Sequence, residues 1–219
     1  MTFKAPDSLC EQIAHHLAEC IIRGELQPGE RIQEQKVTAA LNVSRGSVRE
    51  ALLILERRHL IDILPRRGAQ VSRMTEHNVR SLCTLMSELY ILLANAVAAR
   101  WQDRAELAPF LEIQARLQAS VQREDVICFV EDSFNVMRAA LPFADNPYLQ
   151  ETIENLQPAM SRSYFLALEQ RKASMGEYLI LFAQLLDAVV AREPARIRSV
   201  LGQYGQRSCQ LVLSALAGA

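Results

Sequence analysis

The stretch VSRGSVREAL, residues 43–52, decides the fold of the first third of this chain. Ser44 can begin a helix, because a serine hydroxyl accepts a hydrogen bond from a backbone N–H of the first turn. The apolar residues that follow share one helical face: Val48, Ala51, Leu52 and Leu55. Arg45, Ser47 and Arg49 therefore lie in the first turns, away from the packed face or at its edge.

Two further helices are expected before this one. Ser8 and Glu11 have the spacing of a capping box, and apolar residues then recur every four positions: Leu9, Ile13, Leu17 and Ile21. The turn QPGE at residues 27–30 ends this helix. A second short helix is expected over roughly residues 33–41, followed by a turn at residues 42–43.

A β-hairpin is expected after the third helix. Residues 61–71 read IDILPRRGAQV, in which two short apolar stretches flank a Pro/Gly turn. Arg66 and Arg67 then lie at the tip, next to Gly68. Three short helices followed by such a hairpin form a winged helix-turn-helix.

This arrangement suits duplex DNA. A helix fits the major groove with its N-terminal residues against the base edges, where arginine can bridge two acceptors of guanine. Serine hydroxyls and the helix N-terminus favour phosphate oxygens. A pair of arginines on a wing can reach the adjacent backbone or minor groove.

The charge distribution points the same way. The whole chain has a formal net charge of −1. Residues 42–73 hold seven arginines against three acidic residues, whereas the chain from residue 75 onward holds 13 basic and 16 acidic residues. A basic segment beside an acidic remainder is typical of a protein that meets phosphate with one part only.

Three phrases in this order resemble the GntR family of bacterial regulators: RGELQPGERI at 23–32, VSRGSVREAL at 43–52 and PRRGAQV at 65–71. The resemblance implies that Arg45 and Arg49 read an operator and that Ser44 and Ser47 contact phosphates. It places Gly68 at the wing tip beside Arg66 and Arg67, and Gln35 where relatives often carry a DNA-contacting arginine. Residues 1–74 are therefore the expected DNA-binding domain.

Residues 75–219 are expected to form an all-α bundle. Thr75 can cap a helix to about residue 99, and further helices are expected at roughly 105–121, 124–141, 147–170, 174–191 and 194–216. The last breaks fall at residues 142–147, 171–172 and 193–194. With the phrases FN at 134–135, AL at 140–141 and NPYL at 146–149, this part resembles the FadR-type C-terminal domain, which implies effector binding and dimerisation.

The same resemblance raises the question of a metal. Many relatives hold an ion with one acid and three histidines, and the corresponding positions here are Glu131, Asn135, Phe182 and Tyr204. Such a set is a poor transition-metal site, so no metal and no cofactor are expected. These residues would instead contribute to an effector pocket. Arg162 could pair there with a small organic acid. It could instead form an ordinary ion pair at the surface or between helices. A third alternative is that the pocket binds no ligand.

The sequence lacks the motifs that would indicate several other classes of protein. There is no GxSxG, GxGxxG, Walker loop or HExxH, and no histidine after residue 77, so an enzyme is not expected. The alternatives are a helical protein-interaction module or an enzyme without a recognisable catalytic motif. The apolar runs are short, and the five cysteines are scattered. Asp7 and Glu11 interrupt the N-terminal segment, so no apolar stretch typical of a secretion signal is expected there. We therefore expect a cytoplasmic homodimer, with no membrane contact, whose interface includes the Leu-rich helix over 75–99.

Overall fold

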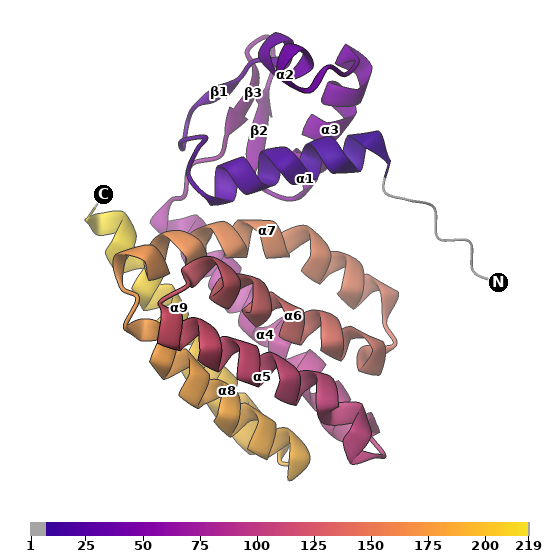
Figure 1. The fold of residues 1–219 in the computed structure, drawn as a ribbon, viewed down its shortest axis with the longest axis vertical. Helices are drawn as coiled ribbons and strands as arrows, with labels where there is room; N and C mark the ends of the chain where they lie inside the picture. Colours follow the sequence, from indigo (N-terminus) through magenta and orange to yellow (C-terminus); the bar gives the residue numbers. More distant parts are fainter. Residues whose placement is uncertain (1–7, 219) are drawn as a thin grey trace, which may run out of the picture. The chain divides into compact units, whose positions relative to one another are not determined.

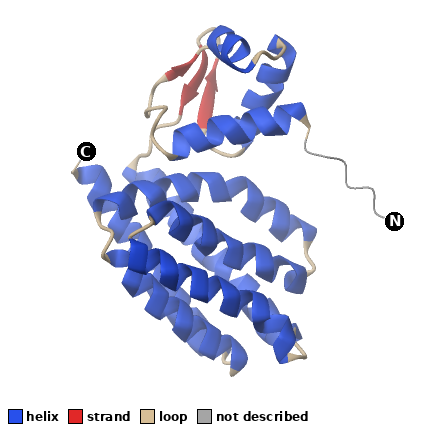
Figure 2. Cartoon of the chain, viewed as in Figure 1, coloured by secondary structure: helices blue, strands red, loops and turns tan. Residues whose placement is uncertain are grey.

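The computed structural model describes residues 8–218. The expectation about a secretion signal in residues 1–7 lies outside this range. The chain divides into two compact units, with the boundary between Met74 and Thr75. Each unit has its own secondary structure, helical and stranded in the first and all-helical in the second (Figure 2).

The first unit contains three helices and a small sheet (Figure 1). The helices are α1 (Leu9–Ile22), α2 (Glu34–Leu41) and α3 (Arg45–Arg57), and the strands are β1 (Arg31–Ile32), β2 (Ile61–Leu64) and β3 (Gly68–Val71). The strands are antiparallel in the order β1-β3-β2. The winged helix-turn-helix expected from the sequence is therefore present. Strand β1 was not expected, because two residues are too few to show an alternating pattern.

Local chemistry explains where these helices begin. The Ser8 hydroxyl accepts a hydrogen bond from the backbone N–H of Glu11 at 3.2 Å, as the capping spacing predicts. All four apolar residues of the expected inner face of α3 are buried. On α1, Ile13, Leu17 and Ile21 are buried, but Leu9 is 49% exposed because it is the first residue of the helix and lies beyond the packed core.

The second unit is a bundle of six α-helices among the described residues. They are α4 (Glu76–Arg100), α5 (Ala108–Arg123), α6 (Val126–Ala144), α7 (Pro147–Gln170), α8 (Ser174–Val190) and α9 (Pro194–Ala217), with a short 3₁₀ helix η1 (Arg104–Leu107) before α5. The break expected at residues 142–147 is present but shorter, because α6 continues through Pro142 to Ala144 before α7 begins at Pro147. A proline in the last turn removes one backbone donor near the end of the helix, where the loss is small. Asp145, with a φ of 47°, then ends the helix.

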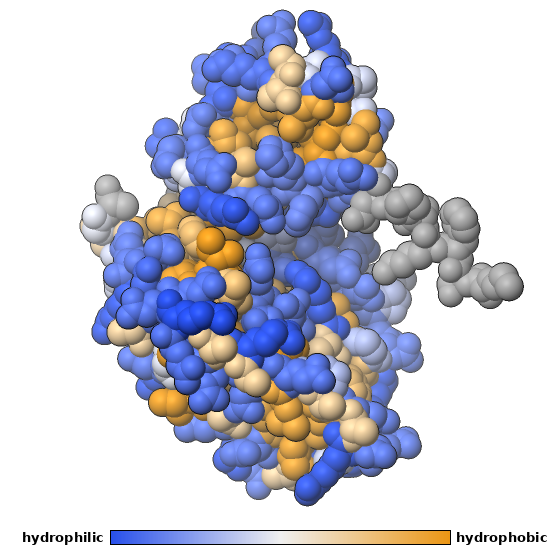
Figure 3. Space-filling model, viewed as in Figure 1, coloured by the Kyte–Doolittle hydropathy of each residue, from blue (hydrophilic) through white to orange (hydrophobic). Residues whose placement is uncertain are grey.

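Helix α4 is the central element of this bundle. It packs against α6, α7, α8 and α9, most extensively against α9. Among the described residues, α4 is the one helix long and apolar enough to cross a membrane by length and composition, and its place among four other helices is that of a bundle core helix. On the face drawn in Figure 3, hydrophobic patches of the bundle are separated by hydrophilic residues.

Candidate functional site

The N-terminal end of α3 is held by two serines. The Ser44 hydroxyl accepts a hydrogen bond from the backbone N–H of Ser47 at 3.0 Å, and the two hydroxyl oxygens are 2.9 Å apart. Asn42 adopts a left-handed φ of 52° and makes the tight turn from α2 into α3. Arg45 is exposed directly after the cap. The turn thus presents the start of α3, with its cationic side chain, to the outside of the unit.

Arg49 lies one turn further along α3 and contacts α2. Its Nε donates a hydrogen bond to a carboxylate oxygen of Glu34 at 2.9 Å. The two side chains are 68% and 33% exposed, so this ion pair contributes at most about 1 kcal/mol to folding. The main effect of the ion pair is on the direction of the Arg49 side chain, because one edge of its guanidinium is held against α2. The sequence analysis missed Glu34, since its partner is fifteen residues away.

The wing presents a second group of arginines. Arg66 has a φ of 63° and Gly68 a φ of 78°, so the turn between β2 and β3 uses two left-handed residues. The Arg67 N–H closes the turn by donating to the Leu64 carbonyl at 3.0 Å. Arg66, Arg67 and Gly68 are all exposed. This is the wing geometry that the Pro/Gly pattern predicts.

Arg31 is a further basic residue that the structure brings to the wing. It pairs with Gln70 across β1 and β3, and its guanidinium lies 3.7 Å from where a Cβ on Gly68 would be. The sequence analysis did not select Arg31, because only the pairing of β1 with β3 shows that it is beside the turn. Gln35 is exposed in the first turn of α2, as expected for a residue available to a ligand.

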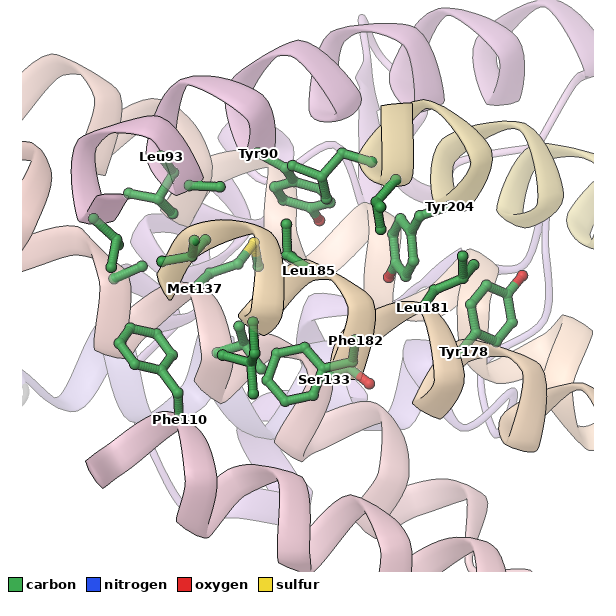
Figure 4. A pocket seen from close by; sticks show the side chains of 18 of the residues that line it. Tyr90, Leu93, Phe110, Ser133, Met137, Tyr178, Leu181, Phe182, Leu185 and Tyr204 are labelled. Carbon is green, nitrogen blue, oxygen red and sulfur yellow. The ribbon is translucent and has the colours of Figure 1, made fainter. Parts of the chain in front are cut away.

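A cavity of about 110 Å³ lies inside the helical bundle (Figure 4). Phe182 and Tyr204 both line it, as the sequence analysis expected. Glu131 and Asn135 are not among the lining residues, and their places on α6 are taken by Ser133 and Met137. The residues of the expected pair and those of the observed pair are both four positions apart, so spacing in the sequence cannot distinguish the two pairs. The pairs are offset by two positions, however, which corresponds to about 200° around the helix.

The residues that do not reach the cavity have other roles. Glu131 is exposed. Asn135 donates to the Asp132 carboxylate at 3.1 Å and accepts from Arg138 at 2.9 Å. Asp132 in turn accepts a hydrogen bond from Arg116 of α5 at 2.8 Å, so this cluster joins α5 to α6. The expectation that Glu131 and Asn135 face the pocket is therefore corrected to Ser133 and Met137.

Arg162 is buried, and the expected interhelix ion pair of this residue stays a prediction. It is on α7 and only 2% exposed, so it is not a surface residue, and it is not among the residues that line the cavity. Desolvation by burial lowers the pKa of its guanidinium.

Three tyrosines are among the residues that line the cavity: Tyr90, Tyr178 and Tyr204. The Tyr178 and Tyr204 rings are 5.4 Å apart and edge-on, and Tyr90 lies 6.3 Å from Tyr204. Behind them, Tyr164 places its hydroxyl 3.0 Å from that of Ser208. Desolvation raises the pKa of Tyr90 and Tyr204 well above the usual value, so both phenols are neutral at physiological pH.

The cavity wall does not fit a metal ion. None of the residues that line it is a histidine, cysteine, aspartate or glutamate, and the described part of the chain holds no cluster of three such residues elsewhere. A serine hydroxyl, a thioether and neutral phenols are weak ligands for the common transition metals. The ligand set that many relatives use is therefore replaced here by an uncharged wall.

A winged helix-turn-helix with exposed arginines, in a chain that also has an all-helical bundle, is the architecture of a class of proteins, the two-domain DNA-binding transcription regulators. Comparison with known families is consistent with this. Residues 9–71 match the bacterial regulatory proteins of the gntR family, and residues 71–206 match the FCD domain. The chain belongs to the GntR family and carries the FadR-type C-terminal domain.

Individual relatives are regulators, not enzymes. The chain is 27% identical over 205 residues to the HTH-type transcriptional repressor RspR of Escherichia coli, covering 92% of this chain and 88% of that protein. It is 27% identical to the gluconate operon transcriptional repressor of Bacillus subtilis, covering 80% of this chain and 70% of that protein. The structure of E. coli McbR/YncC has the same fold, with a TM-score of 0.81 at 22% identity, covering 95% of this chain and 99% of that one.

Proposed function

We propose that this chain is a cytoplasmic, ligand-responsive repressor that binds a palindromic operator as a homodimer. The observation that carries the proposal is the start of α3, where Arg45 and Arg49 are exposed within the first two turns of a helix. Arginine in that position can make the bidentate contact that distinguishes guanine in the major groove. Ser44, Ser47 and Gln35 are then near phosphates, and Arg66 and Arg67 extend the contact at the wing.

The homodimer is supported by the outer face of α4. Leu85 and Leu92 are 46% and 52% exposed, and Leu82 and Leu89, which lie between or beside them on the helix, are half-buried. A row of leucines at helical spacing gains stability when a second copy of α4 covers it. A two-fold dimer presents two copies of α3, and such a dimer matches two half-sites related by the same symmetry.

The ligand response is assigned to the bundle cavity. A small molecule that binds there shifts DNA affinity only if it binds one arrangement of the two α3 helices more tightly than another. Because the wall does not fit a metal, the proposed effector acts through direct contacts with Ser133, Met137, Phe182 and Tyr204. Chelator treatment of the purified protein is then expected to leave operator affinity unchanged.

The wing provides a direct test of DNA binding. An operator is selected from random duplexes with the wild-type protein, and its affinity is measured by fluorescence anisotropy at several salt concentrations. Replacing Arg66 and Arg67 with alanine removes two phosphate contacts per chain and is expected to reduce the slope of log K against log salt by roughly two per chain. The matched control replaces the exposed Arg104 and Arg123 of the bundle, which should leave the slope unchanged.

Light scattering of the same samples tests the dimer. A mass of twice 24.6 kDa at micromolar concentration supports it. A mass of one chain, or an unchanged salt slope in the wing variant, contradicts the corresponding part of the proposal.

A further inference from the structure

The cavity in the bundle has walls without any charged side chain. Its lining is built from aliphatic and aromatic residues, and the lining residues that carry a hydroxyl are Ser133, Tyr90, Tyr178 and Tyr204. No arginine, lysine or histidine is among the residues that line it. The chemistry of the wall therefore differs from that of a pocket for an organic acid, which needs a cation or several strong donors.

The two ends of the cavity differ in polarity. Figure 4 shows one end formed by Leu93, Phe110 and Met137, and the other end by Leu181, Tyr178 and Tyr204. A ligand with one hydrogen-bonding group and an apolar body matches this gradient, because its polar group can meet the phenols while its body displaces no polar contact.

The energetics of burial select against a charged ligand. Moving a carboxylate out of water costs several kcal/mol unless a buried partner compensates for it. Desolvation is likewise the largest cause of the raised pKa of both Tyr90 and Tyr204, as expected where the surroundings disfavour a charged group. An acid placed among them would experience the same penalty, with no cation on the wall to offset it.

The size of the cavity limits the ligand further. An apolar cavity of about 150 Å³ engineered into another protein binds benzene. The present cavity, at about 110 Å³, is of the same order, so a ligand of roughly one ring, or a short branched chain, matches it in size.

From these observations we infer that the effector is a neutral, largely apolar molecule of single-ring size, bound with its one polar group at the Tyr90, Tyr178 and Tyr204 end of the cavity. The inference rests on the proposed ligand-responsive function and replaces the organic acid expected from the sequence. It requires no metal and no contribution from Arg162.

The test compares probes that share a shape and differ in charge. Benzyl alcohol and benzoate are titrated into the full-length protein without DNA, by calorimetry and by thermal shift. Binding of benzyl alcohol at least ten-fold tighter than benzoate is expected. Equal or tighter binding of benzoate, or binding of neither, overturns the inference.

Two adjacent alanines of α6 provide matched variants. Ala140 lines the cavity, whereas Ala139 does not. Ala140→Leu fills the space and is expected to abolish binding of benzyl alcohol, while Ala139→Leu retains it. Circular dichroism and operator affinity establish that each variant is folded. If both folded variants lose binding of benzyl alcohol, or if neither does, the ligand is not bound in this cavity.

The polar end is tested with tyrosine-to-phenylalanine variants. At least one of Tyr90→Phe, Tyr178→Phe and Tyr204→Phe is expected to weaken benzyl alcohol several-fold while leaving toluene, which lacks the hydroxyl, unchanged. If all three leave benzyl alcohol unchanged, the assignment of the polar end is wrong. Operator affinity is measured separately: binding of benzyl alcohol with no change in operator affinity supports the ligand class and contradicts the ligand-responsive function.

Discussion

The start of α3 and the bundle cavity use polar side chains in opposite ways. At α3, Arg45 and Arg49 are exposed and carry full charge, and the ion pair of Arg49 with Glu34 is weak enough to rearrange. In the cavity, Tyr90 and Tyr204 are half-buried, and desolvation keeps their phenols neutral. The first surface is suited to a highly charged polymer, and the second to a small molecule without charge. The comparison teaches that exposure and charge together separate the two regions of this chain.

The largest expected effect is on the exposed side of this comparison. Replacing both Arg45 and Arg49 with alanine is expected to weaken binding of the selected operator by about 2–6 kcal/mol, since each bidentate contact to guanine contributes about 1–3 kcal/mol. Anisotropy titration measures the loss. The bundle variant that lacks Arg104 and Arg123 is the control, and wild-type affinity and selectivity in the α3 variant would mean that α3 is not the recognition helix.

The next effect separates the two faces of α3 itself. Leu55 is fully buried and Leu53 is 56% exposed on the same helix. Leu55→Ala is expected to destabilise the first unit by about 2–5 kcal/mol, because it leaves a cavity in a packed core. Leu53→Ala should change stability by less than about 0.5 kcal/mol. Urea unfolding followed by circular dichroism measures both, and similar losses would contradict the packing of α3.

The buried phenols predict how the bundle responds to alkali. The pKa of Tyr204 is raised by burial, so above about pH 10 the unfolded chain releases a proton that the folded chain keeps. Stability is then unaffected below pH 9 and falls as pH rises further, by at most about 1.4 kcal/mol per pH unit for this group. Tyr204→Phe should reduce the slope. Tyr148 is 80% exposed, so Tyr148→Phe should leave the dependence of stability on pH unchanged. Equal slopes in the wild type and both variants would contradict the effect of burial.

The smallest effect concerns the cap that presents the operator-facing arginines. Ser44→Ala removes the acceptor for the Ser47 N–H and is expected to cost about 1 kcal/mol of stability. Thermal unfolding measures the loss, and Ser44→Asp, which retains an acceptor, is the conservative control. An alanine variant as stable as the wild type would mean that the hydrogen bond contributes nothing to the start of α3.

Local features of the first unit could be predicted from the sequence. The cap at Ser44, the apolar face of α3 and the turn at Gly68 each depend on residues within a few positions of one another. Contacts between distant segments could not be predicted from the sequence. Glu34 reaches Arg49 and Arg31 reaches the wing only because α2 packs on α3 and β1 pairs with β3.

In the bundle, the sequence determined that helices form and roughly where each one begins, because apolar periodicity and capping residues act over a few turns. It also determined that no histidine follows His77, in the first turn of α4. Tertiary structure decided which side of α6 faces the cavity, since Glu131 and Asn135 have the same spacing as Ser133 and Met137. The physical reason is that a helix can pack in several rotations, and only the neighbouring helices, with the side chains that they bury together, select one.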